Sequence, residues 1–339
     1  MTSLLEPLQR FWFSPAPASR LALIRLVIGG YALYLLNKNF GFYIRNAATS
    51  PSLFEPVGPI VFLSQPLSAG LFQALLYATL VFNILFLLGL GYRMSGPIFG
   101  VLLLWMISYR NSWSMIFHTD NLLVLHVLIL GFTRSADALS LDSLRRSASG
   151  TGLAGRLRGW RARLAQPGWE YGYAIRLLCF VTLLVYFLSG VAKLTGPLGA
   201  SWAVGESLRA QVAVDVWRKE LYVSDAPRII YQIYDQLWLF TGLGIGTLVL
   251  ELAAPLVILS GWLAALWVPS ALMMHWGIYH IMGIDFPYQL WGVAFTPFIP
   301  LDRVLHGIGR LRLIPASLTR LIRLGRKNTP GPLAEHLTE

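Results

Sequence analysis

Residues 172–194 have the sequence GYAIRLLCFVTLLVYFLSGVAKL, which is apolar almost throughout. A helix needs about 20 apolar residues to cross the hydrocarbon core of a bilayer, so this stretch predicts a membrane-spanning helix. Lys193 closes the stretch. An ammonium group at the end of a membrane helix either extends to the headgroups or has a functional role, and the sequence leaves both explanations open.

The composition excludes an ordinary soluble domain. Of the 339 residues, 55% are hydrophobic and 13% are charged, and the mean hydropathy is +0.59. Soluble domains carry about 25% charged residues. Because the apolar runs are continuous rather than alternating, they predict helices and not a membrane barrel. We therefore predict an all-α, polytopic transmembrane helical bundle.

Eight segments are apolar enough to be candidates for spanning helices, although the fourth and the eighth are short. They cover approximately residues 21–37, 70–92, 95–110, 119–133, 172–194, 237–261, 263–282 and 286–301.

The charges of the connections predict the orientation. Residues 134–171 hold seven Arg and three acidic residues, and the tail from Asp302 holds six Arg, one Lys and three acidic residues. Residues 195–236 hold four basic and five acidic residues. By the positive-inside tendency, 134–171 and the tail are cytoplasmic and 195–236 is extracytoplasmic. Both termini are then cytoplasmic in a multi-pass protein of a cell membrane, which we expect to be a bacterial inner membrane.

The chain is predicted to form one transmembrane domain, residues 1–302, followed by a basic, partly disordered cytoplasmic tail, residues 303–339. Residues 143–168 are rich in Ser, Gly, Arg and Leu, which is typical of an amphipathic basic segment that touches anionic lipid. We expect no nucleic-acid partner despite the net charge of +11, because the basic residues form two anchor-like blocks. We expect no cleavable signal peptide, since the first apolar run contains Arg25.

Glu251 lies in the middle of the predicted span 237–261. A carboxylate at this depth should be protonated or paired. One hypothesis gives it a structural ion pair with Arg25 or Arg176, and the other makes it a proton relay or the partner of Lys193. Lys193 in turn either reaches water or is a desolvated amine that can act as a base or hold an anion.

Further ionisable residues lie near the predicted extracytoplasmic surface of the membrane, where the helix that carries Lys193 also ends. His118 and Asp120 flank the start of the fourth segment, and His280 and Asp285 lie at the end of the seventh. Their agreement in depth on several helices predicts an outward-facing site.

Each of these residues also has a purely structural explanation. Thr119 or Asp120 can cap the fourth helix, and His126, inside an apolar run, is more typical of a hydrogen-bonded interior residue. His275 and His280 are five residues apart and therefore on different faces of a helix, so they do not form a chelating pair. We predict no metal site.

Several segments together resemble the horizontally transferred transmembrane domain proteins, a superfamily that includes vitamin K-dependent gamma-carboxylase. They follow the order of the family and cover most of residues 18–300. The matching pieces are PASRLALIRLVIGGYALY, SLDSL, YFLSGVAKL followed by SWAVGESL, TLVLELAAPLVIL, and MHWGIYHIMGIDFPYQL.

The resemblance implies roles for individual residues. The lysine that serves as the catalytic base of the carboxylase, which deprotonates reduced vitamin K, matches Lys193. Histidines of the family match His118 and His275, and an acidic position in the sixth helix matches Glu251. A reduced quinone is the cofactor that this implies. Trp202, His280 and Asp120 are the further candidates for binding it.

The chain also departs from the carboxylase. Ala192 stands where the carboxylase has a second lysine. We expect no counterpart of its large luminal domain, because the predicted tail is short and cytoplasmic.

Three functions follow as hypotheses. The first is a lysine-base enzyme of the carboxylase or oxygenase type with a pocket for a quinol or another lipid-soluble ring. The second is a non-catalytic scaffold or accessory subunit that binds other membrane-protein subunits. The third, a transporter, has less support, because no inverted repeat is evident.

Overall fold

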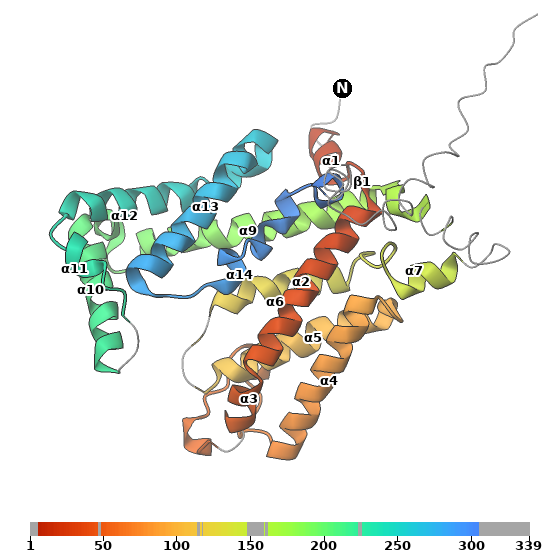
Figure 1. Ribbon diagram of the computed structural model, residues 1–339, viewed down its shortest axis with the longest axis horizontal. Helices are drawn as coiled ribbons and strands as arrows, with labels where there is room; N and C mark the ends of the chain where they lie inside the picture. Colours follow the sequence, from red (N-terminus) through yellow and green to blue (C-terminus); the bar gives the residue numbers. More distant parts are fainter. Residues whose placement is uncertain are drawn as a thin grey trace, which may run out of the picture.

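The computed structural model describes residues 6–304, except 47–48, 114–115, 117, 148–158, 160–161 and 223–225. Within these ranges the chain is almost entirely helical, as the composition predicts (Figure 1). Nearly all of the predicted tail, residues 303–339, and much of the segment 143–168 lie outside the described residues.

The long helix α9 (Trp169–Thr195) joins two regions of the molecule. The first region comprises α2 (Ala18–Lys38), α3 (Phe40–Asn46), η1 (Pro51–Leu53), η2 (Gly58–Ile60), α4 (Ala69–Leu88), α5 (Tyr92–Asn111), η3 (His118–Asp120) and α6 (Asn121–Gly131). The second region comprises the C-terminal half of α9 with η4 (Gly199–Ala203), α10 (Gly205–Leu221), α11 (Ile230–Ile233), α12 (Leu237–Leu252), η5 (Ala254–Leu259) and α13 (Gly261–Met282). After α13, the chain returns through α14 (Pro287–Leu290) and η6 (Val293–Phe298), and η6 packs against both α2 and α9.

The two regions are joined at the beginnings of α2 and α9. The two-residue strands β1 (Ala16–Pro17) and β2 (Pro167–Gly168) pair antiparallel, with Ala16 opposite Gly168. They therefore hold the beginnings of α2 and α9 together, and α1 (Glu6–Trp12) packs beside them. From there α2 and α9 diverge, as Figure 1 shows. Lys38 and Lys193, near the far ends of these two helices, consequently belong to different regions.

Three of the described helices are long and apolar enough to cross a membrane: α2, α4 and α9. They correspond to the predicted segments 21–37, 70–92 and 172–194. The helices α6 and α12 are apolar but shorter. The predicted segments 95–110 and 263–282 are also helical, in α5 and α13.

Two predicted segments are not single helices. The segment 237–261 ends as an α-helix at Leu252 and continues as the 3-10 helix η5, because Pro255 has no amide hydrogen to donate and disfavours a helical residue before it. The segment 286–301 is divided into α14 and η6 by Gly292, whose φ of 71° is in the left-handed region. The prediction of one continuous helix was wrong in both places.

The first region contains most of the largest hydrophobic core. Its helices α5 and α6 cross closely, since a Cβ atom at Gly96 would lie 2.7 Å from the carbonyl oxygen of Gly131. Such small-residue contacts are common between membrane helices. The second region has two smaller cores, one in which Tyr186 and Trp267 pack with Phe295 of η6, and one around Val216 and Phe240.

Candidate functional site

Lys193 and Glu251 form an ion pair between α9 and α12. The Lys193 Nζ atom lies 2.7 Å from both Oε1 and Oε2 of Glu251 and donates hydrogen bonds to them. The Glu251 side chain is 6% exposed, and the Lys193 side chain is 23% exposed. The carboxylate is thus enclosed by protein, whereas the ammonium group still has access to the surroundings. Of the hypotheses for Glu251, the structure shows the pairing with Lys193.

A glycine allows this ion pair to form. Gly190 lies one turn before Lys193 on the same face of α9, and a Cβ atom there would be 3.0 Å from the Cβ atom of Glu251 and 3.1 Å from Leu252. A larger residue would therefore push α12 away from α9. The distance between Nζ and the carboxylate depends on this close approach of the two helices.

Trp202 also contacts the amine of Lys193. The Lys193 Nζ atom lies 5.0 Å from the centre of the Trp202 ring, within the range of a cation–π interaction. Trp202 belongs to η4, which packs on α12, since a Cβ atom at Gly244 would lie 2.9 Å from the Ala203 carbonyl oxygen. At the start of α10, directly after η4, the Gly205 amide donates to Thr241 Oγ1 at 3.1 Å. These contacts fix the position of Trp202 over Lys193.

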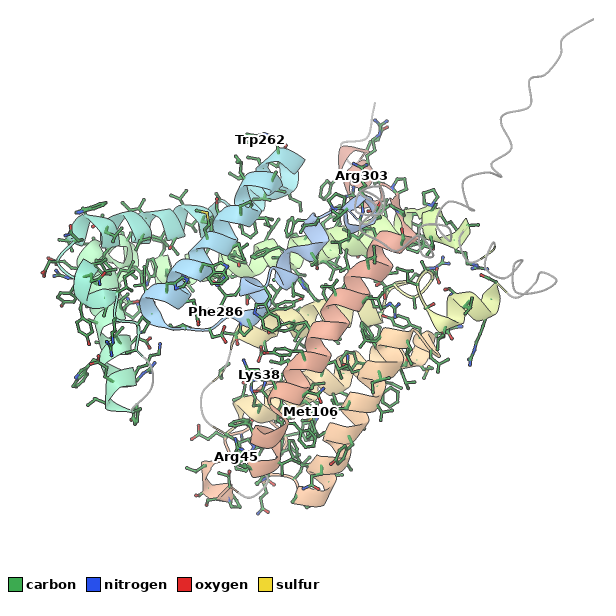
Figure 2. All side chains as sticks on the ribbon, viewed as in Figure 1. Lys38, Arg45, Met106, Trp262, Phe286 and Arg303 are labelled. Atoms are coloured by element: carbon green, nitrogen blue, oxygen red, sulfur yellow. The ribbon has the colours of Figure 1, made fainter. Side chains whose placement is uncertain are left out.

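His275, on α13, contacts the face of α9 that carries Lys193, two helical turns nearer the start of α9. Its Nε2 atom is 2.7 Å from the hydroxyl of Tyr186, which precedes Lys193 by two helical turns. His275 also packs against Phe286, with ring centres 5.0 Å apart, and Figure 2 labels Phe286 at the start of the return toward α14.

One nitrogen of His275 has no hydrogen-bond partner among the described residues. His275 is 6% exposed, and within the described residues its Nδ1 atom makes no hydrogen bond. If Tyr186 donates to Nε2, the Nδ1–H group alone is unsatisfied; the opposite arrangement would leave both the Tyr186 hydrogen and the Nδ1 lone pair without partners. The first arrangement satisfies more groups, so we assign the hydrogen to Nδ1. It is a buried donor without an acceptor.

The other predicted site residues do not contact Lys193 in any described interaction. Asp120 pairs with Arg110 in the first region at 2.7 Å. It makes no side-chain capping bond to α6, so of the two capping candidates, Thr119 and Asp120, the second does not cap the helix through its side chain. His280 is exposed and stacks on Trp276, with ring centres 5.5 Å apart. His118 belongs to η3, but its side chain lies outside the described residues.

The two arginines considered as partners of Glu251 bind elsewhere. Arg25 is fully buried and donates to the carbonyl groups of Phe86, Leu87 and Leu139. Arg176 donates to the backbone and the hydroxyl of Ser14. The hypothesis that either arginine pairs with Glu251 was therefore wrong.

His126 is the interior residue that its apolar surroundings indicate. Its Nδ1 atom lies 2.7 Å from the Tyr288 hydroxyl, and its Nε2 atom lies 3.0 Å from Thr182 Oγ1. Because the Thr182 hydroxyl already donates to the Leu178 carbonyl, Nε2 of His126 must be the donor of the pair. Both ring nitrogens are satisfied, which leaves none for a ligand.

Sequence reasoning missed Tyr186 and Arg110. Tyr186 could have been found from its spacing, since seven residues before Lys193 places it on the same helical face. Arg110 ends α5 and was not connected to Asp120, because the two are neighbours only in the folded chain.

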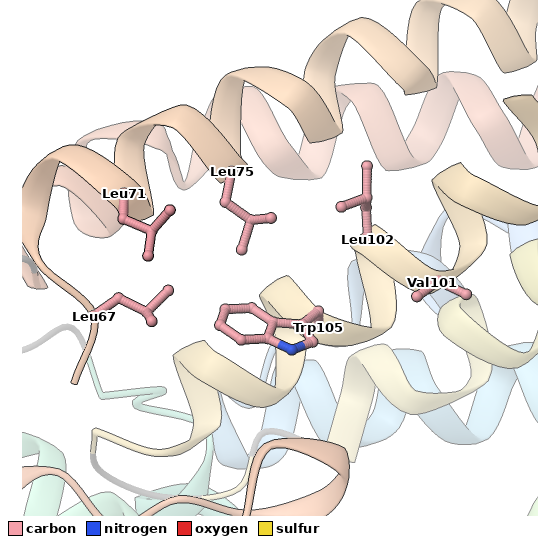
Figure 3. Close-up of a pocket in the computed structure, with 6 residues that line it drawn as sticks. All are labelled: Leu67, Leu71, Leu75, Val101, Leu102 and Trp105. Carbon is pink, nitrogen blue, oxygen red and sulfur yellow. The ribbon is translucent and has the colours of Figure 1, made fainter. Parts of the chain in front are cut away.

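A separate apolar hollow lies in the first region between α4 and α5. Its volume is about 230 Å³, and Figure 3 shows the residues that line it: Leu67, Leu71, Leu75, Val101, Leu102 and Trp105. None of the predicted site residues belongs to this hollow. Within the described part of the chain, no group of three or more His, Cys, Asp or Glu side chains is placed to hold a metal ion.

Comparisons with known proteins add no assignment: no family model, curated protein or solved structure matches this chain. The arguments about function consequently depend on the geometry of the chain itself.

Proposed function

We propose that the chain is a multi-pass membrane protein of the horizontally transferred transmembrane domain type, with a site at Lys193 and Glu251 for a quinol or a similar lipid-soluble ring. The proposed activity is lysine-base chemistry of the kind that the resemblance to gamma-carboxylase implies. The observation that carries the proposal is the equal distance of 2.7 Å from Lys193 Nζ to both carboxylate oxygens of Glu251.

This geometry supports a role in proton transfer. An ammonium group has no lone pair and cannot accept a proton, so Lys193 must first give one up. Glu251 Oε1 or Oε2 can take that proton from Nζ along an existing hydrogen bond. The amine then has a free lone pair and can accept a proton from a bound hydroxyl group, while Glu251 holds the first proton as a neutral acid.

The residues around the pair fit a ring that carries oxygen atoms. The unsatisfied Nδ1–H group of His275 is suited to an oxygen acceptor, and Trp202 offers an aromatic surface next to Lys193. A bound reduced quinone would supply the acidic hydroxyl group and the reducing electrons. Tyr186 binds His275 two helical turns before Lys193 on α9. Lys193 and His275 would therefore contact such a ring at two separate points and orient it.

The membrane location supports the same proposal. Lys193 lies near the end of α9, one of the three helices suited to span a bilayer. We propose that α5, α6, α12, α13 and the segment formed by α14 and η6 complete the bundle of about eight spans in a bacterial inner membrane, with residues 195–236 and the site on the outer side. A lipid-soluble substrate would then reach Lys193 from the bilayer.

The test is turnover of reduced vitamin K, with dioxygen supplied as the oxidant, by the purified protein in lipid nanodiscs. Lys193→Ala and Glu251→Gln should each lower turnover by roughly 100-fold or more, as the loss of a positioned acid–base group does. Lys38→Ala is the matched control, because Lys38 also lies 3.8 Å from a carboxylate, that of Asp285, but belongs to α2. Turnover by Lys193→Ala at the rate of the unmodified protein would refute the catalytic role.

The second candidate is a non-catalytic scaffold or accessory subunit. It is favoured by the observation that the apolar hollow of Figure 3 lies away from the ion pair. In this case the unmodified protein would neither bind nor oxidise reduced vitamin K. A partner subunit would co-purify with it and could be cross-linked through residues close to Trp202.

A further inference from the structure

The short helix α7 (Leu141–Arg146) has its polar and apolar faces reversed relative to a helix packed on a protein core. Ser143 is fully buried and Ser147 nearly so, whereas Leu141 is 37% exposed and Leu144 is 36% exposed. Leucines three residues apart share one face of a helix. A helix that buries serines and exposes leucines is expected where the surroundings are apolar.

Hydrogen bonds fix this orientation. The Asp142 carboxylate accepts from the amides of Gly91 and Tyr92 at 3.1 and 2.8 Å, and its own amide donates to the Gly89 carbonyl at 3.1 Å. Ser140 and Ser143 form a capping box at the start of the helix. The two leucines therefore cannot turn inward without breaking these bonds.

An apolar stripe on α4 ends close to the exposed leucines of α7. Tyr77, Val81, Ile84 and Leu88 are all exposed, and their spacing of four, three and four residues places them on one face. This helix is one of the candidate membrane spans. Since Leu88 directly precedes Gly89, which Asp142 contacts, the stripe ends next to α7. Bilayer lipid is the environment that suits the whole surface.

Two arginines lie at the same end of this stripe. Arg145 shares the exposed face of α7 with the leucines, and Arg93 is exposed at the start of α5, close to the Asp142 contacts. Neither forms an ion pair with a described residue, whereas the neighbouring Arg146 lies 3.3 Å from Asp137. A guanidinium group at the end of a membrane helix is well suited to a lipid phosphate.

We propose that α7 lies in the headgroup layer of the membrane, with Leu141 and Leu144 among the upper acyl chains and Arg93 and Arg145 bound to phosphates of anionic phospholipid. This role does not depend on Lys193 or on the proposed catalysis.

Binding of phosphatidylglycerol to the full-length protein in detergent, titrated by native mass spectrometry, tests the arginines. The double variant Arg93→Gln, Arg145→Gln should bind phosphatidylglycerol more weakly by roughly fivefold per arginine, with phosphatidylcholine binding unchanged. The matched control is Arg209→Gln, Arg228→Gln, which removes the same charge from residues 195–236 and should bind normally. Equal affinity in the two double variants would overturn the assignment of the phosphate site.

A spin label tests the position of the leucines independently of lipid charge. The label is attached at Leu144→Cys in a Cys179→Ser background, because Cys179 is the single native cysteine. In phosphatidylcholine–phosphatidylglycerol liposomes, collisions with oxygen should exceed those with a water-soluble nickel chelate, and the reverse should hold for a label at Glu206→Cys. A water-accessible label at position 144, or spectral broadening by a second copy, would overturn the membrane location.

Discussion

Each region of the molecule has a buried ion pair that joins two different elements, and these two pairs differ in how completely they are enclosed. In the first region, the Arg110 and Asp120 side chains are 8% and 5% exposed. In the second region, Glu251 is 6% exposed but Lys193 is 23% exposed. An enclosed pair is held by protein on all sides, whereas the cation of a partly open pair can also interact with an incoming group.

The two buried histidines show the same difference as the ion pairs: the histidine of the first region has more of its polar atoms bonded within the protein. His126 has both ring nitrogens hydrogen-bonded, to Tyr288 and Thr182. His275 has one bonded nitrogen and one without a partner among the described residues. Burial of an ionisable group is thus not sufficient to indicate a site. Between the two buried histidines, incomplete hydrogen bonding distinguishes His275, which lies two helical turns from Lys193 in the second region.

The largest effect is expected for the ion pairs. Asp120→Asn should destabilise the protein by about 3–5 kcal/mol, because it leaves the Arg110 charge buried without its counter-charge. Glu251→Gln should cost less, about 1–2 kcal/mol, since Lys193 can be solvated where it is exposed. Denaturant unfolding of both variants in the same detergent measures the difference. Equal losses would show that the second pair is as enclosed as the first.

A smaller effect is expected for the histidines. His126→Phe removes two hydrogen bonds and leaves the Tyr288 hydroxyl and a Thr182 lone pair unsatisfied, at a cost of about 2–4 kcal/mol. His275→Phe leaves only the Tyr186 hydroxyl unsatisfied and should cost about 1–2 kcal/mol. The comparison uses the same unfolding measurement. A larger loss for His275→Phe would mean that its Nδ1 atom contributes to stability through a contact yet to be identified.

The smallest effect concerns Arg20 and Asp302, a pair between α2 and the residues after η6. Burial raises the pKa of the Asp302 carboxyl group, but the hydrogen bond and the charge of Arg20, 2.6 Å away, lower this pKa more, so it lies below its ordinary value. A depressed folded-state pKa stabilises the protein above the unfolded pKa of about 3.9, and this contribution is lost as the pH falls through the folded pKa.

Asp302→Asn should therefore destabilise the protein at neutral pH by at most about 1 kcal/mol. The difference from the unmodified protein should shrink in acid and vanish below the folded pKa. Unfolding free energies between neutral pH and about pH 2.5 measure this. A difference that stays constant over the whole range would exclude the ion pair as its cause.

Much of the fold could be predicted from hydropathy. The long apolar runs at 21–37, 70–92 and 172–194 are helices in α2, α4 and α9, because such runs satisfy their backbone groups internally. Hydropathy failed at 237–261 and 286–301. Apolar content does not show where a proline or a left-handed glycine divides a helix, as Pro255 and Gly292 do.

The candidate site was predictable only in part. Lys193 and Glu251 were identified because a charge within an apolar run is costly and needs an explanation. Asp120 was assigned to the same site from its expected depth, yet it pairs with Arg110 in the first region. Depth along the membrane normal is one coordinate, and residues at equal depth can still lie in different regions.

The sequence by itself determined that the chain forms apolar helices with a lysine at the end of one and a glutamate within another, because local hydropathy depends only on neighbouring residues. Only the tertiary structure decided which cation pairs with Glu251. Lys193, Arg25 and Arg176 were all candidates, and helix packing determines which of them reaches Glu251. The backbone carbonyls near the end of α4 bind Arg25, and Ser14 binds Arg176. Gly190 allows α12, which carries Glu251, to approach Lys193. Such contacts join residues far apart in the chain, and no local pattern encodes them.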